Sequence, residues 1–196
     1  MRMVELMNVQ QNNLLPLPTP WEELSTPLWY VIQTRSRYEV KVESGLTRKG
    51  LEVFLPKVTV RSRRRDRRQM LEAPLFPGYL FVRTDLNEWA HDNIIRTLGV
   101  VRILGIKGQC APVPEDTVTS LRTLVNSGQP VFPWSKLTPG KRVRVVEGPL
   151  TGAIGVILRN KQGKRRLLVA VELLGRSVCA ELAEEIVEVD DSKSTG

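Results

Sequence analysis

Residues 74–82 read PLFPGYLFV, a segment that joins a turn to a strand. Its Pro-Gly pair is a turn signal, and the aromatic and apolar residues that follow are typical of a β-strand. Within that strand Tyr79 and Phe81 share one face, because side chains alternate along a strand. Such aromatic residues are either core residues or exposed anchors for a protein partner. Periodicity leaves both possibilities open.

The flanking segments predict a compact α+β sheet domain over residues 29–128. Short apolar runs predict strands at residues 28–33, 53–55, 58–60, 79–82 and 100–104. Three helices are expected: one that ends at Gly50, one that ends at Gly99, and one that runs from Pro114 to near Gly128. The second helix is indicated by Ile94, Ile95 and Leu98. The predicted inward-facing residues of the first and third helices are Tyr38, Val42, Leu46, Val118, Leu121, Leu124 and Val125.

The chain changes character after residue 128. Residues 129–138 are rich in proline and predict a semi-rigid linker. Residues 139–190 contain short apolar runs separated by turn signals, which predict a small all-β barrel, because closure removes exposed strand edges. Residues 1–28 show no sustained period and are expected to be a flexible leader, with a short tail at residues 191–196.

Composition excludes several classes of protein. The chain has 29 Lys and Arg against 21 Asp and Glu, a net charge of +8, which favours a polyanionic partner. No segment approaches the roughly 18 apolar residues of a membrane-spanning helix. Cys110 and Cys179 are too far apart for a CxxC metal site. His91 is the one histidine, and no phosphate-binding motif is present. We therefore expect a cytoplasmic monomer without catalytic activity, metal or cofactor.

The strongest local signal for function is the run RSRRRDRR at residues 61–68. It falls where the tip of a hairpin is expected, between Val60 and Met70. Arginine makes bidentate contacts with phosphate, and clustered arginines repel one another unless an anion is near. We predict a nucleic-acid contact at this tip, with a solvated loop as the alternative. The contact residues are Arg61, Arg63, Arg64, Arg65, Arg67 and Arg68.

Several motifs together resemble the NusG family of transcription factors. Residues 29–30, 54–56 and 74–82 are similar to its N-terminal (NGN) domain, and GPLTG at residues 148–152 is similar to its KOW module. The resemblance covers nearly all of the chain outside the leader and the tail. It implies an NGN-like antiparallel sheet flanked by helices, followed by an SH3-like KOW barrel. It also implies a transcription elongation and antitermination factor that suppresses pausing or termination.

The resemblance implies the partners of the first domain as well. It implies docking on the clamp of the largest subunit of RNA polymerase, through Trp29, Phe76, Pro77, Tyr79 and Phe81. It implies contact with the non-template DNA strand at the start of the first helix, through Arg35, Arg37, Tyr38 and Lys41. Cations combined with an aromatic ring suit single-stranded DNA. The arginine run would then contact upstream duplex DNA.

KOW modules of this family bind a ribosomal protein or the terminator Rho. The resemblance implies a partner loop at residues 148–155, with contacts from Pro149, Leu150, Ala153 and Ile154. An aromatic residue is common in the family where this chain has Ala153, so the chain departs from the pattern at an expected anchor.

Three features resemble specialised members of the family, of the RfaH, UpxY and LoaP type, which act as antiterminators for long operons. These are the PLFP form of residues 74–77, the dense arginine run and the longer leader. Some such proteins refold the KOW module into helices, but β-branched residues such as Val143 and Val169 favour a stable barrel here. The alternative function is a translation-linked RNA-binding protein with a basic β-barrel.

Overall fold

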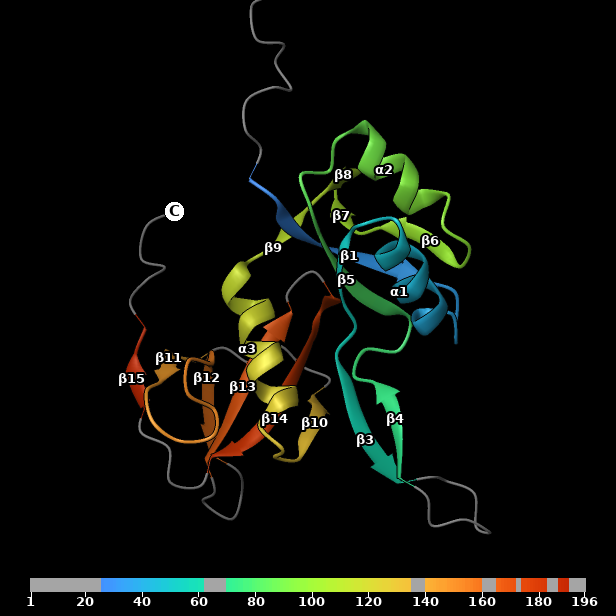
Figure 1. Ribbon diagram of the computed structural model, residues 1–196. Coiled ribbons are helices and arrows are strands. Elements are labelled where there is room, and N and C mark those ends of the chain that lie inside the picture. Colours follow the sequence, from blue (N-terminus) through green and yellow to red (C-terminus); the bar gives the residue numbers. More distant parts are fainter. Residues whose placement is uncertain are drawn as a thin grey trace, which may run out of the picture.

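The computed structural model describes residues 26–61, 70–134, 140–159, 165–171, 174–182 and 187–190. Within them the chain forms a first part with a helix-flanked sheet and a second, all-β part (Figure 1). This confirms the predicted α+β fold class and the all-β nature of the second part. None of the helices found in these ranges is long and apolar enough to cross a membrane. Nearly all of the predicted leader and the whole predicted tail lie outside the described residues.

Five antiparallel strands form the sheet of the first part. Its strands are β1 (Leu28–Thr34), β2 (Glu52–Phe54), β5 (Tyr79–Thr84), β6 (Val100–Ile103) and β9 (Pro112–Val113). The order is β2-β5-β1-β6, and β9 also pairs with β1. Two hairpins accompany this sheet: β3 (Lys57–Arg61) with β4 (Met70–Pro74), and β7 (Gly105–Ile106) with β8 (Gln109–Cys110).

Helices cover both faces of this sheet, which explains why four successive residues of β1 are buried. Tyr30 and Ile32 belong to a buried cluster with residues of α1 (Glu39–Arg48) and α2 (Glu88–Ile95). Trp29 and Val31, on the opposite face, belong to a second cluster with residues of α3 (Glu115–Asn126). The alternation of strand side chains therefore divides the core of the first part in two.

The second part is one antiparallel sheet with the order β10-β14-β13-β12-β11-β15. Its strands are β10 (Val131–Trp134), β11 (Arg142–Val145), β12 (Ile154–Arg159), β13 (Arg165–Val171), β14 (Arg176–Leu182) and β15 (Val187–Val189). Strand β10 lies within the predicted linker. It pairs with β14 in a regular antiparallel register from Val131–Ala180 to Trp134–Ser177, so part of the linker is an edge strand.

Helix α3 connects the cores of the two parts. In Figure 1 it lies across the strands of the second sheet. One continuous cluster of buried side chains contains Leu121 and Leu124 of α3, Phe81 of the first sheet, and Leu167 and Val178 of the second sheet. The two parts are therefore packed together through α3 in this structure.

The end of α2 differs from the prediction. Asn87 caps the helix by accepting a hydrogen bond from the Ala90 amide at 2.8 Å, and the helix ends at Ile95. With this start, Ala90 and Ile94 face the core, because residues four apart share a helix face. The helix was predicted to end at Gly99 and ends four residues earlier; Ile95 and Leu98, which indicated it, are 40% and 72% exposed.

Candidate functional site

The aromatic segment is a tight turn that enters β5. The Tyr79 amide donates to the Phe76 carbonyl at 3.0 Å, and Gly78 has a φ of 85°. Proline at the second position and glycine with positive φ at the third are the requirements of a type II turn. Pro77 is exposed at the corner of this turn. The local sequence therefore fixes the position of the residues predicted to dock on a partner.

Three of these predicted docking residues lie in the core. Trp29, Phe76 and Phe81 are between 0% and 2% exposed. The Phe81 ring lies 6.2 Å from that of Phe76, edge to face. The Arg122 guanidinium of α3 stacks 4.9 Å above the Trp29 ring and pairs with Glu52 at 2.9 Å. These three aromatic residues form the base of the site rather than its accessible surface.

Tyr79 links this turn to the second part. Its side chain is half-buried, and the guanidinium of Arg176, at the start of β14, lies 5.5 Å from its ring. A cation over an aromatic face is attracted by the ring quadrupole. Sequence reasoning missed both Arg122 and Arg176, because stacking partners from distant elements leave no local pattern in the sequence.

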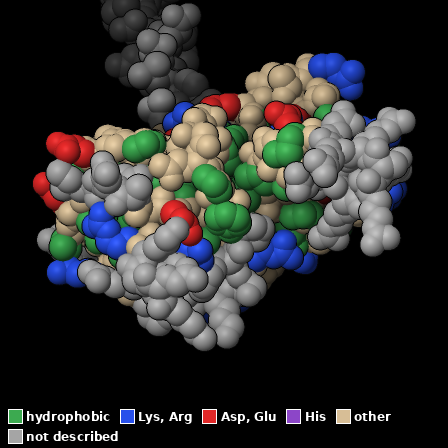
Figure 2. Space-filling view, turned by 90° about the horizontal axis from the view of Figure 1, so that it is seen from below, with side chains coloured by type: hydrophobic (Ala, Val, Ile, Leu, Met, Phe, Trp, Pro, Cys, Tyr) green, Lys and Arg blue, Asp and Glu red, His purple; other side chains and the backbone are tan. Residues whose placement is uncertain are grey.

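A groove beside the turn carries exposed apolar side chains. It has a volume of about 1140 Å³ and lies between the β3–β4 hairpin, the end of α3 and β10. Met70, Leu71 and Phe132 border it and are 61%, 44% and 46% exposed. Seen from this side, hydrophobic side chains gather in the middle of the face (Figure 2). Pro77 and this groove are the accessible part of the aromatic site.

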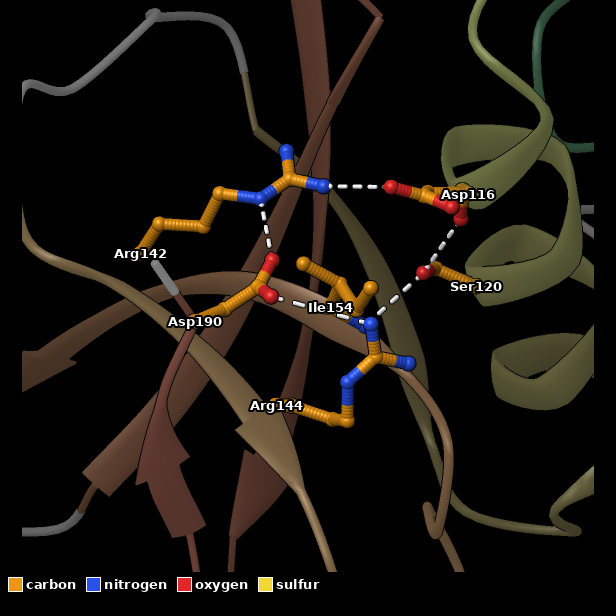
Figure 3. A network of polar contacts seen from close by, with 6 residues as sticks. All are labelled: Asp116, Ser120, Arg142, Arg144, Ile154 and Asp190. Carbon is orange, nitrogen blue, oxygen red and sulfur yellow. Dashed lines mark hydrogen bonds and ion pairs between the residues drawn. The ribbon is translucent and has the colours of Figure 1, made fainter. Parts of the chain in front are cut away.

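A polar network fastens α3 to the second part (Figure 3). Arg142 of β11 pairs with Asp116 of α3 at 2.8 Å and with Asp190 at 2.6 Å. The Ser120 hydroxyl accepts a hydrogen bond from the Ile154 amide at 2.8 Å and donates to the Asp116 carbonyl at 2.6 Å. Ser120 is fully buried, so its bond to the second part is shielded from water.

The start of α1 presents a second, cationic surface. Arg35, Arg37 and Lys41 are exposed there, and Tyr38 is half-buried. The Lys41 ammonium lies 5.0 Å from the centre of the Tyr38 ring. The structure therefore brings together the four residues predicted to contact the non-template strand. It also confirms that Tyr38 packs at the edge of the core, beside the α1 and α2 cluster.

A close backbone approach shapes this cationic surface. The Arg35 amide donates to the Gly99 carbonyl at 2.7 Å, which places the exposed Leu98 nearby. Gly99 has a φ of 99°, and a Cβ there would lie 2.5 Å from the Tyr38 ring. Glycine is therefore required at this position. Leu98 is a neighbour of the cationic surface that sequence reasoning did not include in it.

The hairpin that carries the arginine run is confirmed on both sides of its tip. Arg61 ends β3 and pairs with Met70, which begins β4. Arg63, Arg64, Arg65, Arg67 and Arg68 lie outside the described residues. Their contact with nucleic acid stays a prediction.

The predicted partner loop of the second part is mostly buried. Pro149 is exposed, but Leu150 and Ala153 are 0% exposed and Ile154 is 5% exposed. The Ala153 amide donates to the Leu150 carbonyl at 3.0 Å, which closes the turn. Because Ile154 also donates to Ser120, the contact with α3 occupies one end of this loop.

The described residues offer little for bond chemistry. They contain no group of three or more His, Cys, Asp or Glu side chains placed to hold a metal ion. Cys110 and Cys179 are free thiols, and burial raises the pKa of the Cys179 thiol. A raised thiol pKa lowers the fraction of reactive thiolate.

Known proteins resemble this chain along most of its length. A family model described as Transcription termination factor nusG matches residues 27–122. The Transcription termination/antitermination protein NusG of Borreliella burgdorferi is 30% identical over 178 residues, covering 82% of this chain and 97% of that protein. The protein of the same name from Pseudomonas aeruginosa is 30% identical over 171 residues, with the same coverage of 82% and 97%. A solved structure, described as domain interaction in Thermotoga maritima NusG, is 22% identical with a TM-score of 0.49, covering 83% and 97% of the two chains.

Proposed function

Because the chain belongs to the NusG family, we propose that it is a transcription elongation and antitermination factor that binds RNA polymerase and DNA together. The observation that carries this proposal is the combination, in one domain, of an aromatic turn with an exposed cationic helix start. The first suits a protein partner, since aromatic residues dominate binding energy at interfaces. The second suits a nucleic-acid strand. A protein that works on polymerase and DNA in this way acts in the cytoplasm.

Docking on the polymerase clamp would use the turn of residues 76–79 and the groove beside it. Pro77, Met70 and Leu71 are accessible there, and Tyr79 becomes accessible once Arg176 leaves its ring. Docking of the whole aromatic site therefore requires the second part to move away from the turn. The apparent affinity for polymerase is then the intrinsic affinity reduced by the fraction of open molecules.

DNA contacts would come from two places on the first part. Arg35, Arg37 and Lys41 provide phosphate contacts to the non-template strand, and the exposed edge of Tyr38 provides a surface for base stacking. The arginine run at the hairpin tip would contact upstream duplex DNA, where phosphate contacts position the protein without reading sequence.

The mechanism we propose involves no bond chemistry. A factor that binds the elongating state of the polymerase more tightly than the paused state shifts the enzyme towards elongation by that difference in affinity. Contact with the non-template strand adds to the difference where the strand is exposed. Suppression of pausing or termination follows from this shift.

The KOW part would bind a ribosomal protein or Rho. Pro149 is the accessible residue of its predicted loop, and Ile154 becomes accessible when Ser120 releases it. We also propose that the protein is a specialised antiterminator of the RfaH, UpxY and LoaP type. The arginine run and the PLFP segment support this assignment. The second part is all-β in this structure, as the β-branched residues predict.

The test is binding of the purified chain to an assembled transcription elongation complex, compared with the same nucleic-acid scaffold without polymerase. We expect the protein to half-saturate the elongation complex at a concentration at least about tenfold lower than the scaffold alone, because protein and DNA contacts act together. Tyr79→Ala should weaken binding to the complex but not to the scaffold. Ile106→Ala, a change of an exposed apolar residue on another hairpin, is the matched control. Equal binding to complex and scaffold would instead identify a general nucleic-acid or RNA-binding protein.

The arginine run is tested in the same assay. Replacing Arg63, Arg64 and Arg65 by alanine should weaken binding and make it less sensitive to salt, because each phosphate contact releases counterions. Unchanged binding to the complex would remove the DNA role from these residues, while leaving the docking role of the turn intact.

A further inference from the structure

A buried carboxylate lies between the aromatic turn and the cationic surface. Glu39 is the first residue of α1 and is 6% exposed. Its Oε1 accepts a hydrogen bond from the Gly78 amide at 2.7 Å. Buried carboxylates are uncommon unless they are paired or hydrogen-bonded, and this one is bonded to the backbone of a turn in another element. The start of α1 and the aromatic turn are therefore joined directly.

The same turn is held from its other side. The Thr34 amide, at the end of β1, donates to the Gly78 carbonyl at 2.8 Å. Both polar groups of Gly78 are thus bonded to the segment 34–39, and these two bonds tie the turn to the end of β1 and the start of α1. The position of Tyr79 and Pro77 follows from the orientation of this peptide.

The cationic surface surrounds Glu39 in the sequence. Tyr38 precedes it as the N-cap residue of α1, without a side-chain capping bond, and Lys41 follows in the first turn. A carboxylate at this end of the helix is also favoured by the helix dipole. The Gly78–Glu39 bond therefore ties the aromatic turn to the first turn of α1, next to Tyr38 and Lys41.

We propose that Glu39 is a positioning residue that couples polymerase docking to non-template strand contact. When the partner fixes the turn of residues 76–79, the Gly78–Glu39 bond fixes the first turn of α1 in the orientation that meets the strand. The coupling is reciprocal, because linkage between two binding events acts equally in both directions. This inference rests on the proposed function of the two surfaces.

The experiment measures how much the non-template strand contributes to binding. The full chain is titrated against elongation complexes assembled with and without the single-stranded non-template segment, and the ratio of the two dissociation constants is determined. For the native chain we expect a ratio of roughly tenfold. For Glu39→Ala the ratio should fall below about twofold, while affinity for the complex without the strand changes little. Glu39→Gln, which keeps the carbonyl acceptor for Gly78, should restore most of the ratio.

Glu43→Ala is the matched control. Glu43 lies one turn further along α1 and pairs with Lys57 at 2.9 Å, so its loss changes the charge of the same helix without affecting Gly78. It should leave the ratio unchanged. Thermal unfolding of each variant shows whether the chain is folded at the assay temperature. If Glu39→Ala is unfolded, Glu39→Asp, whose shorter side chain withdraws the carboxylate from the Gly78 amide, provides the readout and should show the same fall in the ratio.

The outcomes separate the coupling from the proposed function. Failure of the native chain to bind the complex, or to gain from the strand, overturns the proposed function before any variant is compared. If the native chain shows the expected ratio of dissociation constants and Glu39→Ala shows the same ratio, the coupling alone is overturned. Equal weakening of both complexes by Glu39→Ala, with the ratio preserved, also overturns it, since that result shows a structural role without coupling.

Discussion

The aromatic turn and the cationic start of α1 flank the same end of β1, yet they differ strongly in exposure to solvent. Phe76 is 2% exposed and Tyr79 lies under Arg176 of the second part, whereas Arg35 and Arg37 are exposed. Burial of apolar surface is favourable by about 25 cal/mol per Å², so packing of α3 and the second part over the aromatic residues stabilises the molecule. Cations are well hydrated, and covering them without a partner is costly.

This difference gives the two surfaces different roles in the free protein. The cationic residues Arg35, Arg37 and Lys41 are exposed in the closed molecule, while most of the aromatic site is covered by α3 and the second part. In the closed molecule the Ser120–Ile154 bond also occupies one end of the predicted KOW loop. Separation of the two parts would expose the proposed docking surfaces of both parts at the same time, so a ligand of either part would favour binding of the other.

The largest expected effect comes from the core that the two parts share. Leu121→Ala removes a fully buried side chain of α3 and leaves a cavity, which should lower the free energy of unfolding by about 3 kcal/mol. For a chain of this size the midpoint of thermal unfolding should fall by roughly 6–12 °C. Thr119→Ala, at an exposed position of the same helix, should shift it by less than about 2 °C. Equal shifts for the two variants would contradict the shared core.

The next effect tests whether the second part, packed against α3, limits access to the aromatic site. Ser120→Ala leaves the buried Ile154 amide without its acceptor when the molecule is closed, which should favour opening by about 1–3 kcal/mol. Affinity for the elongation complex should rise by roughly 5-fold to 100-fold, limited by the fraction already open. Titration of the elongation complex with this variant measures the rise.

Thr123→Ala is the control for that change. Thr123 also donates to the carbonyl four residues before it, at 3.1 Å, but this bond stays within α3. Its loss should leave the affinity for the complex unchanged. An unchanged affinity for Ser120→Ala as well would show that closure does not limit docking.

The strands that could be predicted from sequence are those with local patterns. The runs of β1 and β5 and those of the second part carry their own apolar and β-branched residues, so each can be found without knowledge of its neighbours. Of the two possibilities left open for the aromatic residues, Phe81 is a core residue, while Tyr79 is half-buried and its role as an anchor stays a prediction.

The packing of α3 against both the first and the second sheet could not be predicted in the same way. Its apolar stripe of Val118, Leu121 and Leu124 indicates one buried face. Ser120 is also fully buried. A serine on a helix is expected to lie on the polar surface unless the strand that hydrogen-bonds to it is known. The pairing of Arg142 with Asp116 depends on the same tertiary contact. Contacts between elements distant in sequence leave no periodic signal.

A smaller effect concerns the linker strand. While β10 pairs with β14, α3 is connected to the second sheet by residues 127–130 alone, which span at most ~14 Å. If β10 is released, the connection is the whole segment 127–141, which spans up to ~50 Å when extended. Phe132 lies directly opposite Cys179, so Phe132→Cys in a Cys110→Ser background places two thiols in register for a disulfide. The oxidised protein should bind the elongation complex roughly tenfold more weakly than the reduced protein.

Val131→Cys in the same background is the matched control, because the residue opposite it is Ala180. Oxidation should not change its affinity for the complex. Equal affinity of the oxidised and reduced Phe132→Cys protein would show that docking does not need the longer reach of a released linker.

The smallest expected effect belongs to the surface that is already exposed. Arg37→Ala should weaken binding to the elongation complex by only about 2-fold to 4-fold at moderate salt, and should reduce the slope of log affinity against log salt by ~0.7, the value for one contact with single-stranded DNA. Arg48→Ala removes the same charge from the last turn of α1, away from Tyr38, and should leave the slope unchanged. A uniform loss for both variants would show that net charge, rather than the start of α1, attracts the strand. Because Arg37 is exposed in the closed molecule, its effect should be the same with and without Ser120→Ala, whereas the effect of Tyr79→Ala should grow when the cover is loosened.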